Sequence, residues 1–213
     1  MDNIFDELYL PDGGVRSHYA GYQNWLADVD PRLIAQKRAE ADSAFHRHGI
    51  TFAVYGEESG TERLIPFDIL PRIIPAAEWR GLEAGLRQRV AALNAFIHDI
   101  YSGQRIVKAG LVPAEQVLGN AQYRPQVRDV AVRNDLYAMI AGIDIVRAAL
   151  PGKASQSAEY YVLEDNLRVP SGVSYMIENR QVTKRVLADL FRDLDIHPVD
   201  AYPTRLHQLL CSL

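Results

Sequence analysis

Residues 159–172 read EYYVLEDNLRVPSG, and this stretch decides most of what the sequence predicts about the fold. Its aromatic and β-branched beginning favours a strand over residues 159–164. The Pro-Ser-Gly turn at its end is typical of a helix start, so a helix is expected over about residues 171–191. A strand that leads directly into a helix gathers polar side chains at the junction, and here those are residues 164–166.

Candidate metal ligands lie on this strand and on the one before it. Side chains two residues apart share a face of a strand, so Glu164 and Asn166 are expected to project together. A carboxylate beside an amide oxygen is a hard, oxygen-only ligand pair of the kind that Mg²⁺ prefers. Asp144 lies in a predicted buried strand over residues 136–146, where an unpaired charge is costly. If the two strands are neighbours, Asp144 faces Glu164 and completes a three-ligand set.

Three positions after the strand are candidates for contact with substrate. Arg168 could clamp a carboxylate or phosphate at two points, which makes it the candidate catalytic residue. Ser171 and Gly172 open the predicted helix, and a helix N-terminus offers unpaired N–H groups to an anion. Simpler roles stay open. Arg168 could merely pair with Asp165 or another surface acid, and Ser171 could merely cap the helix.

The other predicted elements extend outward from this centre. Apolar side chains recur every three or four residues in a long helix that begins near Ala76 and ends at Gly103. A second helix is predicted over residues 31–49, with Asp30 as its cap. A hairpin over residues 51–66 follows it. We therefore expect a mixed α/β fold, in which the long helix backs a sheet that holds the two later strands. The predicted domains are residues 1–75, with the first helix and hairpin, and residues 76–213, with the metal-binding strands.

Composition excludes several classes of protein. The chain has 213 residues, 48% of them hydrophobic, and a net charge of −4, which gives no electrostatic reason to bind nucleic acid or an anionic membrane. A single cysteine, Cys211, cannot form an internal disulfide, so a reducing cytoplasm is the expected compartment. The acidic N-terminus does not resemble a signal peptide, and no apolar run is long enough to span a bilayer.

Together these stretches resemble a known family. Residues 161–172, preceded by Gly142-Ile143-Asp144, are similar to the metal-binding end of ATP-grasp ligases, including the Glu-x-Asn pattern of glutathionylspermidine synthetase and bacterial glutathione synthetase. The chain as a whole resembles the N-terminal half of the circularly permuted ATP-grasp proteins of bacteria. That wider resemblance is carried by residues 66–75, 93–101, 118–120, 171–176 and 178–180.

The resemblance implies an activity. Ligases of this family phosphorylate a carboxylate with ATP and let an amine attack the acyl phosphate, with Mg²⁺ bridging the phosphates. It implies ATP and Mg²⁺ as cofactors, a peptide-like or amino-acid-like substrate, Asp144, Glu164 and Asn166 as metal ligands, and Arg168, Ser171 and Gly172 near the acyl group. Where relatives carry a hydroxyl residue before the proline, this chain has Val169. The second half of such an enzyme is then expected as a partner, on the same or a separate chain.

Other interpretations stay open. The chain could be a non-catalytic remnant or a regulatory module that keeps the fold without turnover. Asp144 and Glu164 could also serve a hydrolase as a carboxylate pair that works without metal. Taken alone, Asp144 also fits a strand-end acid, and the pair of Glu164 and Asn166 also fits turn chemistry.

Overall fold

The computed structural model describes residues 5–53, 62–64, 66–149, 158–168 and 170–213. Its contacts divide the chain into two compact units. The first unit comprises Met1–Pro75, Ala148–Glu159 and Ser171–Pro203, and the second comprises Ala76–Arg147, Tyr160–Pro170 and Thr204–Leu213. The first unit thus also contains segments from beyond residue 76. The predicted domains, residues 1–75 and 76–213, stay a prediction.

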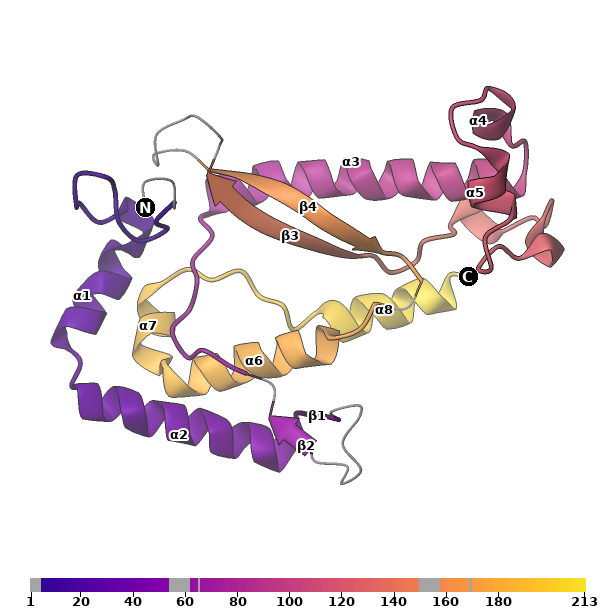
Figure 1. Cartoon of the computed structure of the whole chain (residues 1–213). Coiled ribbons are helices and arrows are strands. Elements are labelled where there is room, and N and C mark those ends of the chain that lie inside the picture. Colours follow the sequence, from indigo (N-terminus) through magenta and orange to yellow (C-terminus); the bar gives the residue numbers. More distant parts are fainter. Residues whose placement is uncertain (1–4, 54–61, 65, 150–157, 169) are drawn as a thin grey trace. The chain divides into compact units, whose positions relative to one another are not determined.

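The chain contains eight α-helices, three short 3-10 helices and four strands among its described residues. The α-helices are α1 (Ala20–Asp28), α2 (Pro31–His48), α3 (Ala76–Tyr101), α4 (Arg105–Lys108), α5 (Ala114–Leu118), α6 (Val173–Val186), α7 (Ala188–Asp193) and α8 (Tyr202–Cys211) (Figure 1). The 3-10 helices are η1 (Ser17–Tyr19), η2 (Pro125–Val127) and η3 (Arg133–Asp135). The strands are β1 (Thr51–Ala53), β2 (Glu62–Leu64), β3 (Gly142–Ala149) and β4 (Ala158–Asn166).

The first predicted helix and hairpin are confirmed. Asp30 accepts a hydrogen bond from the Arg32 N–H at 2.7 Å at the start of α2, and Gly49 ends the helix in the left-handed conformation. That conformation is strained for residues with a Cβ, which explains the glycine. β1 and β2 then pair antiparallel in one-to-one register, with Phe52 opposite Arg63. Residues 54–61, between the two strands of this hairpin, lie outside the described residues.

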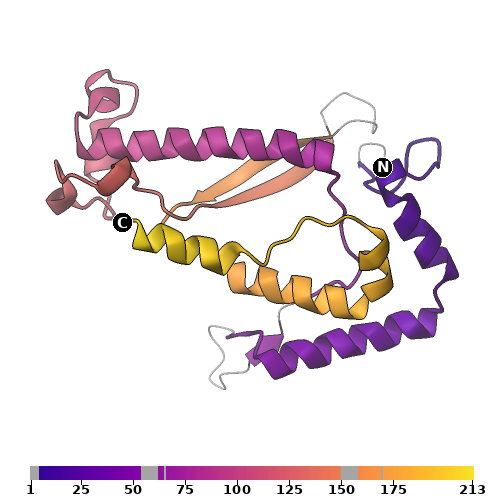
Figure 2. The ribbon, with the colours of Figure 1, turned by 180° about the vertical axis from the view of Figure 1, so that it is seen from behind.

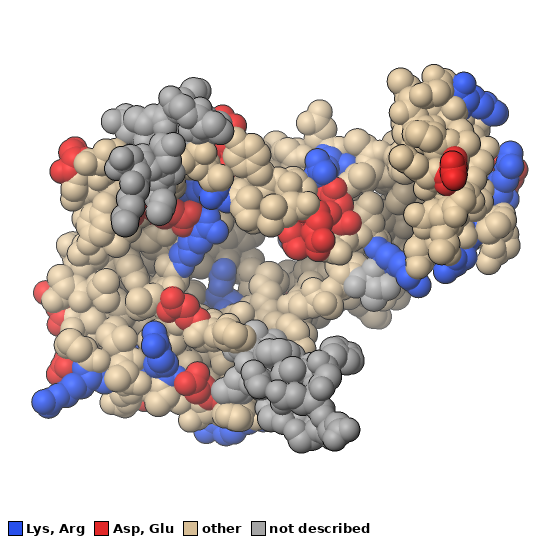
Figure 3. All heavy atoms as spheres, in the orientation of Figure 1, with Lys and Arg blue, Asp and Glu red and all other residues tan. Residues whose placement is uncertain are grey.

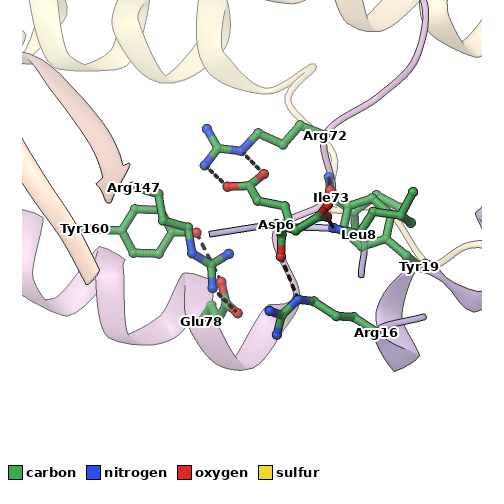
Figure 4. A network of polar contacts seen from close by, with 10 residues as sticks. Asp6, Leu8, Arg16, Tyr19, Arg72, Ile73, Glu78, Arg147 and Tyr160 are labelled. Carbon is green, nitrogen blue, oxygen red and sulfur yellow. Dashed lines mark hydrogen bonds and ion pairs between the residues drawn. The ribbon is translucent and has the colours of Figure 1, made fainter. Parts of the chain in front are cut away.

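The first unit holds two apolar clusters. One is built from Ala41, Ala44, Phe45, Ile50, Ile69, Val182 and Val186, and the other from Tyr19, Tyr22, Leu187 and Leu190. Phe45 packs edge-on against Phe67, with ring centroids 4.7 Å apart. The Tyr19 hydroxyl accepts a hydrogen bond from the Ile73 N–H at 2.8 Å (Figure 4). Leu33, on the same helix α2 as Phe45, is 39% exposed and belongs to neither cluster.

In the second unit, α3 runs along one face of the β3–β4 hairpin in both views (Figures 1 and 2). The two strands are hydrogen-bonded neighbours and their arrows point in opposite directions, so the hairpin is antiparallel. The mixed α/β fold, with the hairpin backed by α3, is therefore confirmed.

Two predicted elements need correction. The apolar stretch from residue 136 does not extend as a strand, because η3 precedes it and the Asn94 side chain binds the backbone of Tyr137 and Ala138; β3 starts only at Gly142. The helix expected over residues 171–191 is two helices, because the backbone of Leu187 leaves the helical conformation with φ −116° and ψ 41°. Among the described residues, no helix has the length and apolar character that a membrane span requires.

Candidate functional site

The two faces of the β3–β4 hairpin differ in exposure. On β3, Ile143, Ile145 and Arg147 are half-buried on the α3 side, whereas Asp144 and Val146 are exposed on the other. Exposed side chains on β4 are Glu159, Tyr161, Leu163, Glu164 and Asn166. One face of the hairpin is therefore open, and it carries three polar side chains near the end where β4 stops.

The three predicted metal ligands meet on this open face. The carboxyl group of Asp144 on β3 lies beside that of Glu164 on β4, and the Asn166 amide donates to Glu164 Oε1 at 2.9 Å. Acidic side chains gather over the hairpin on the face seen in Figure 3. The structure thus brings together the residues that the strand periodicity singled out.

Two carboxyl groups this close affect each other's charge. Partial desolvation, then the hydrogen bond to Glu164 and its negative charge, raise the pKa of the Asp144 carboxyl above its ordinary value of 3.8. A cation between the two groups would remove this repulsion. The site therefore has the donor chemistry of a hard metal ion, with two carboxylates and one amide oxygen.

The donor set is small. Among the residues described, no three His, Cys, Asp or Glu side chains gather as a metal cluster, so the third donor here is the Asn166 amide. Mg²⁺ commonly binds one or two protein carboxylates and completes its shell with water and substrate phosphates. The residues present therefore fit a nucleotide-bound Mg²⁺ better than a closed structural metal site.

An ion pair joins the other face of β4 to α3. Arg89 binds Asp165 at two points, with Nε to Oδ1 at 2.7 Å and Nη2 to Oδ2 at 2.6 Å. The hydrogen bond from Arg89 is the main cause that lowers the pKa of the Asp165 carboxyl. Such a two-point pair fixes the rotation of β4 about its axis, because both guanidinium and carboxylate planes are constrained.

A second polar cluster ties the hairpin to the beginning of α3. Arg147 Nη2 donates to Glu78 Oε1 at 3.1 Å, and the Tyr160 hydroxyl donates to Glu78 Oε2 at 3.1 Å (Figure 4). The Arg147 guanidinium also lies over the Tyr160 ring, 5.3 Å from its centroid. The Arg147 side chain is only 10% exposed, so this cluster is largely screened from water.

Gly142 allows the strand ends to approach closely. A Cβ at this position would lie 2.9 Å from Pro170 Cβ and 3.5 Å from Asn166 Cβ. Real Cβ atoms do not approach another carbon as closely as 2.9 Å, so a side chain at residue 142 would displace Pro170. The absence of a side chain at Gly142 therefore allows Pro170 and Asn166 to lie close to the start of β3.

The three candidate substrate-binding residues, Arg168, Ser171 and Gly172, belong to different units of the chain. Arg168 lies beyond the end of β4, is exposed, and donates from Nη1 to Gln122 Oε1 at 2.9 Å, so the predicted alternative of a pair with Asp165 is wrong. Ser171 is not the cap of α6, since that position is taken by Gly172, with φ +92° and no side-chain cap hydrogen bond. Ser171 and Gly172 belong to the first unit, and their contact with a shared ligand stays a prediction. Val169 lies outside the described residues.

No pattern in the sequence predicted which residues hold the candidate ligands in place. Arg89 and Glu78 lie on α3 among other charged residues of the same helix, and Gln122 lies in an irregular segment. A signal did exist for Arg147, because a charge in an apolar strand needs a partner, as was argued for Asp144.

A family model described as circularly permuted ATP-grasp type 2 matches residues 71–213. A Synechocystis sp. relative, named as an uncharacterised protein, is 41% identical over 211 residues, which are 99% of this chain and 42% of that protein. A Mycobacterium tuberculosis (strain H37Rv) relative, also named as uncharacterised, is 38% identical over 97% of this chain and 35% of its own length. A Frankia casuarinae protein named "Putative glutamate--cysteine ligase 2-2" is 36% identical over 98% of this chain and 23% of its own length. The chain thus spans less than half the length of these relatives.

Proposed function

Because the chain belongs to the circularly permuted ATP-grasp type 2 family, we propose that it supplies the metal-binding edge of an ATP-dependent carboxylate–amine ligase. The observation that carries the proposal is the meeting of Asp144, Glu164 and Asn166 on the open face of the β3–β4 hairpin. Their three oxygen donors would hold a Mg²⁺ ion that accompanies ATP.

Each residue has a defined part in the proposal. The bound metal supplies charge neutralisation where the phosphoryl group is transferred to a carboxylate, which gives an acyl phosphate that an amine can attack. Asp144 and Glu164 provide the negative charge that attracts the metal, and Asn166 provides a neutral oxygen. Arg168 would bind the substrate carboxylate or its phosphate, with Gln122 limiting the positions of its guanidinium.

Substrates are proposed only as classes, a carboxylate and an amine of peptide or amino-acid type. The Frankia relative bears a glutamate–cysteine ligase name, but the chain matches 23% of that protein's length. That name therefore assigns neither glutamate nor cysteine to the matched part. Because the relatives are longer than this chain, turnover is proposed for the site when a second polypeptide region supplies the rest of the nucleotide pocket.

The metal edge is tested by titrating the chain with Mn²⁺, an oxygen-seeking ion that electron paramagnetic resonance detects directly. The Asn166→Ala variant is expected to bind Mn²⁺ at least about tenfold more weakly, because one donor is lost. Its melting temperature without metal should stay close to that of the parent chain, because Asn166 is exposed.

The matched control is Gln88→Ala, which removes an exposed amide from α3. It is expected to change neither the affinity nor the melting temperature. If Asn166→Ala keeps the parent affinity, Asn166 is not a ligand. If it lowers the melting temperature of the metal-free chain by many degrees, its role is structural.

The alternative to a ligase edge is a non-catalytic module that keeps the fold without turnover. Calorimetric titration with Mg-ATP separates the two. A ligase edge is expected to bind the nucleotide weakly through its metal, and Asp144→Asn should abolish that heat. A module that has lost the nucleotide site gives no heat in either protein.

A further inference from the structure

The contacts across the β3–β4 hairpin are spaced differently on the two strands. Asp144 lies beside Glu164, in the same register in which a Cβ at Gly142 would lie 3.5 Å from Asn166 Cβ. Arg147 lies over the ring of Tyr160. The first members of these pairs are three positions apart on β3 (147 minus 144), but the second are four apart on β4 (164 minus 160). β3 has eight residues and β4 has nine. β4 therefore contains one residue more than its partner between the two contacts.

The burial of β4 points to the same irregularity. Tyr160 and Asp165 both contact α3, through Glu78 and Arg89 respectively. In a regular strand, side chains an odd number of positions apart lie on opposite faces. The alternation instead changes phase where Leu163 and Glu164, two consecutive residues, are both exposed. A strand with one extra residue shows this pattern.

We propose that β4 carries a one-residue β-bulge at Leu163–Glu164, and that Arg89 and Asp165 are positioning residues which hold the turned end of the strand. The bulge directs Glu164 and Asn166 to the open face where Asp144 lies. The inference deepens the proposed function, and its consequence for metal binding depends on that function. Bulges occur next to active sites, where they re-aim side chains.

The alternative arrangement of the strand shows why a clamp is needed. In a regular strand without a bulge, Glu164 and Asn166 would lie on the same face as Val162, which is the α3 side. Asp165 would then face solvent. Asp144 would then be the lone candidate ligand of the three on the open face. The two short hydrogen bonds of Arg89 to Asp165, at 2.7 and 2.6 Å, oppose this rotation directly.

The bulge can be tested without metal by engineered disulfides in a Cys211→Ser background. Two pairs are expected to oxidise, Asp144→Cys with Glu164→Cys and Arg147→Cys with Tyr160→Cys, because each would place two Cβ atoms across the strands. A third pair, Arg147→Cys with Tyr161→Cys, is expected to stay reduced. A regular strand that joins 144 to 164 would oxidise the third pair and leave the second reduced, which would overturn the proposal.

Deletion of Leu163 tests the same point through Mn²⁺ affinity. If Leu163 belongs to a bulge, its removal restores regular alternation and leaves Glu164 and Asn166 on the open face, so the affinity persists. In a regular strand the same deletion turns both residues to the α3 side, and binding is lost. Deletion of Val146, an equally apolar exposed residue of β3, is the control and is expected to abolish binding because β3 has no residue to spare.

The positioning role is tested by Arg89→Leu, which is expected to weaken Mn²⁺ binding by about 10- to 100-fold without removing any ligand. The exchange of charges in Arg89→Asp with Asp165→Arg should recover part of the affinity, which a loss of packing alone would not predict. Unchanged affinity in Arg89→Leu would contradict the role of the pair. If the parent chain binds no Mn²⁺, the proposed metal edge fails, while the disulfide pairs still decide the bulge.

Discussion

Different kinds of contact stabilise the interior of each unit. The first unit buries two apolar clusters, with Phe45 and Leu187 each 1% exposed. In the described part of the second unit the buried hydrophobic residues are Ile100 and Ala138, and side-chain hydrogen bonds join β3 and β4 to α3. The candidate metal ligands belong to the second, polar unit.

This difference has a consequence for function. Apolar burial is non-directional, whereas a two-point ion pair constrains the direction in which a strand presents its side chains. A site that needs three oxygens on one face of a two-stranded hairpin gains from the second kind of contact. The polar unit should therefore respond strongly to charge changes, and the apolar unit should respond strongly to changes of volume.

The largest expected effect is on the apolar unit. Phe45→Ala should lower the free energy of unfolding by about 3–5 kcal/mol, because it removes a ring that packs against Phe67 and leaves a cavity. Chemical denaturation measures it. Leu33→Ala, on the same helix but 39% exposed, is the control and should change stability by less than about 0.5 kcal/mol. Equal losses in both variants would contradict the assignment of the core.

A smaller loss is expected when the polar unit loses a charge. Arg147→Met keeps much of the side-chain volume but leaves Glu78 without its cation, and should cost about 1–3 kcal/mol of unfolding free energy. The comparison variant is Arg87→Met, which breaks an exposed pair with Glu83 on α3 and should cost at most about 0.5 kcal/mol. Similar costs for the two variants would mean that the Glu78 cluster is no stronger than a surface ion pair.

The smallest effect is a change of titration on the two faces of β4. Glu164→Gln should lower the pKa of Asp144, because it removes the neighbouring negative charge, and Arg89→Leu should raise the pKa of Asp165. Carboxyl chemical shifts followed by NMR against pH measure both. If either pKa moves in the opposite direction, the assigned neighbour is wrong.

These shifts also give the sign of the pH dependence. Asp144 has a raised pKa in the folded chain, so its contribution to stability is present below its ordinary pKa and is lost as pH rises through the raised value. Asp165 has a lowered pKa, so its contribution is present above its ordinary pKa and is lost as pH falls through the lowered value. In Arg89→Leu, the loss of unfolding free energy at acid pH that is attributed to Asp165 should disappear from a plot of stability against pH.

Local patterns in the sequence predicted much of the fold. The limits of α2 followed from Asp30, Pro31 and Gly49, because caps act within a few residues of a helix end. α3 followed from its apolar spacing, since one helix face must meet the core. The start of β3 could not be predicted in this way. The bond from Asn94 to Tyr137 joins residues 43 positions apart, and it holds the preceding stretch out of the strand.

The candidate site, too, was predicted from the sequence only in part. The sequence by itself determined that Glu164 and Asn166 share a face, because neighbouring side chains of a strand alternate with a period of two. It could not determine whether that face meets α3 or solvent, because alternation separates the two faces of a strand without saying which one is covered. The contact of Arg89 with Asp165 sets that phase at the end of β4, and it joins residues distant in the chain. The tertiary structure alone therefore decided that these candidate ligands meet Asp144 on the open face of the hairpin.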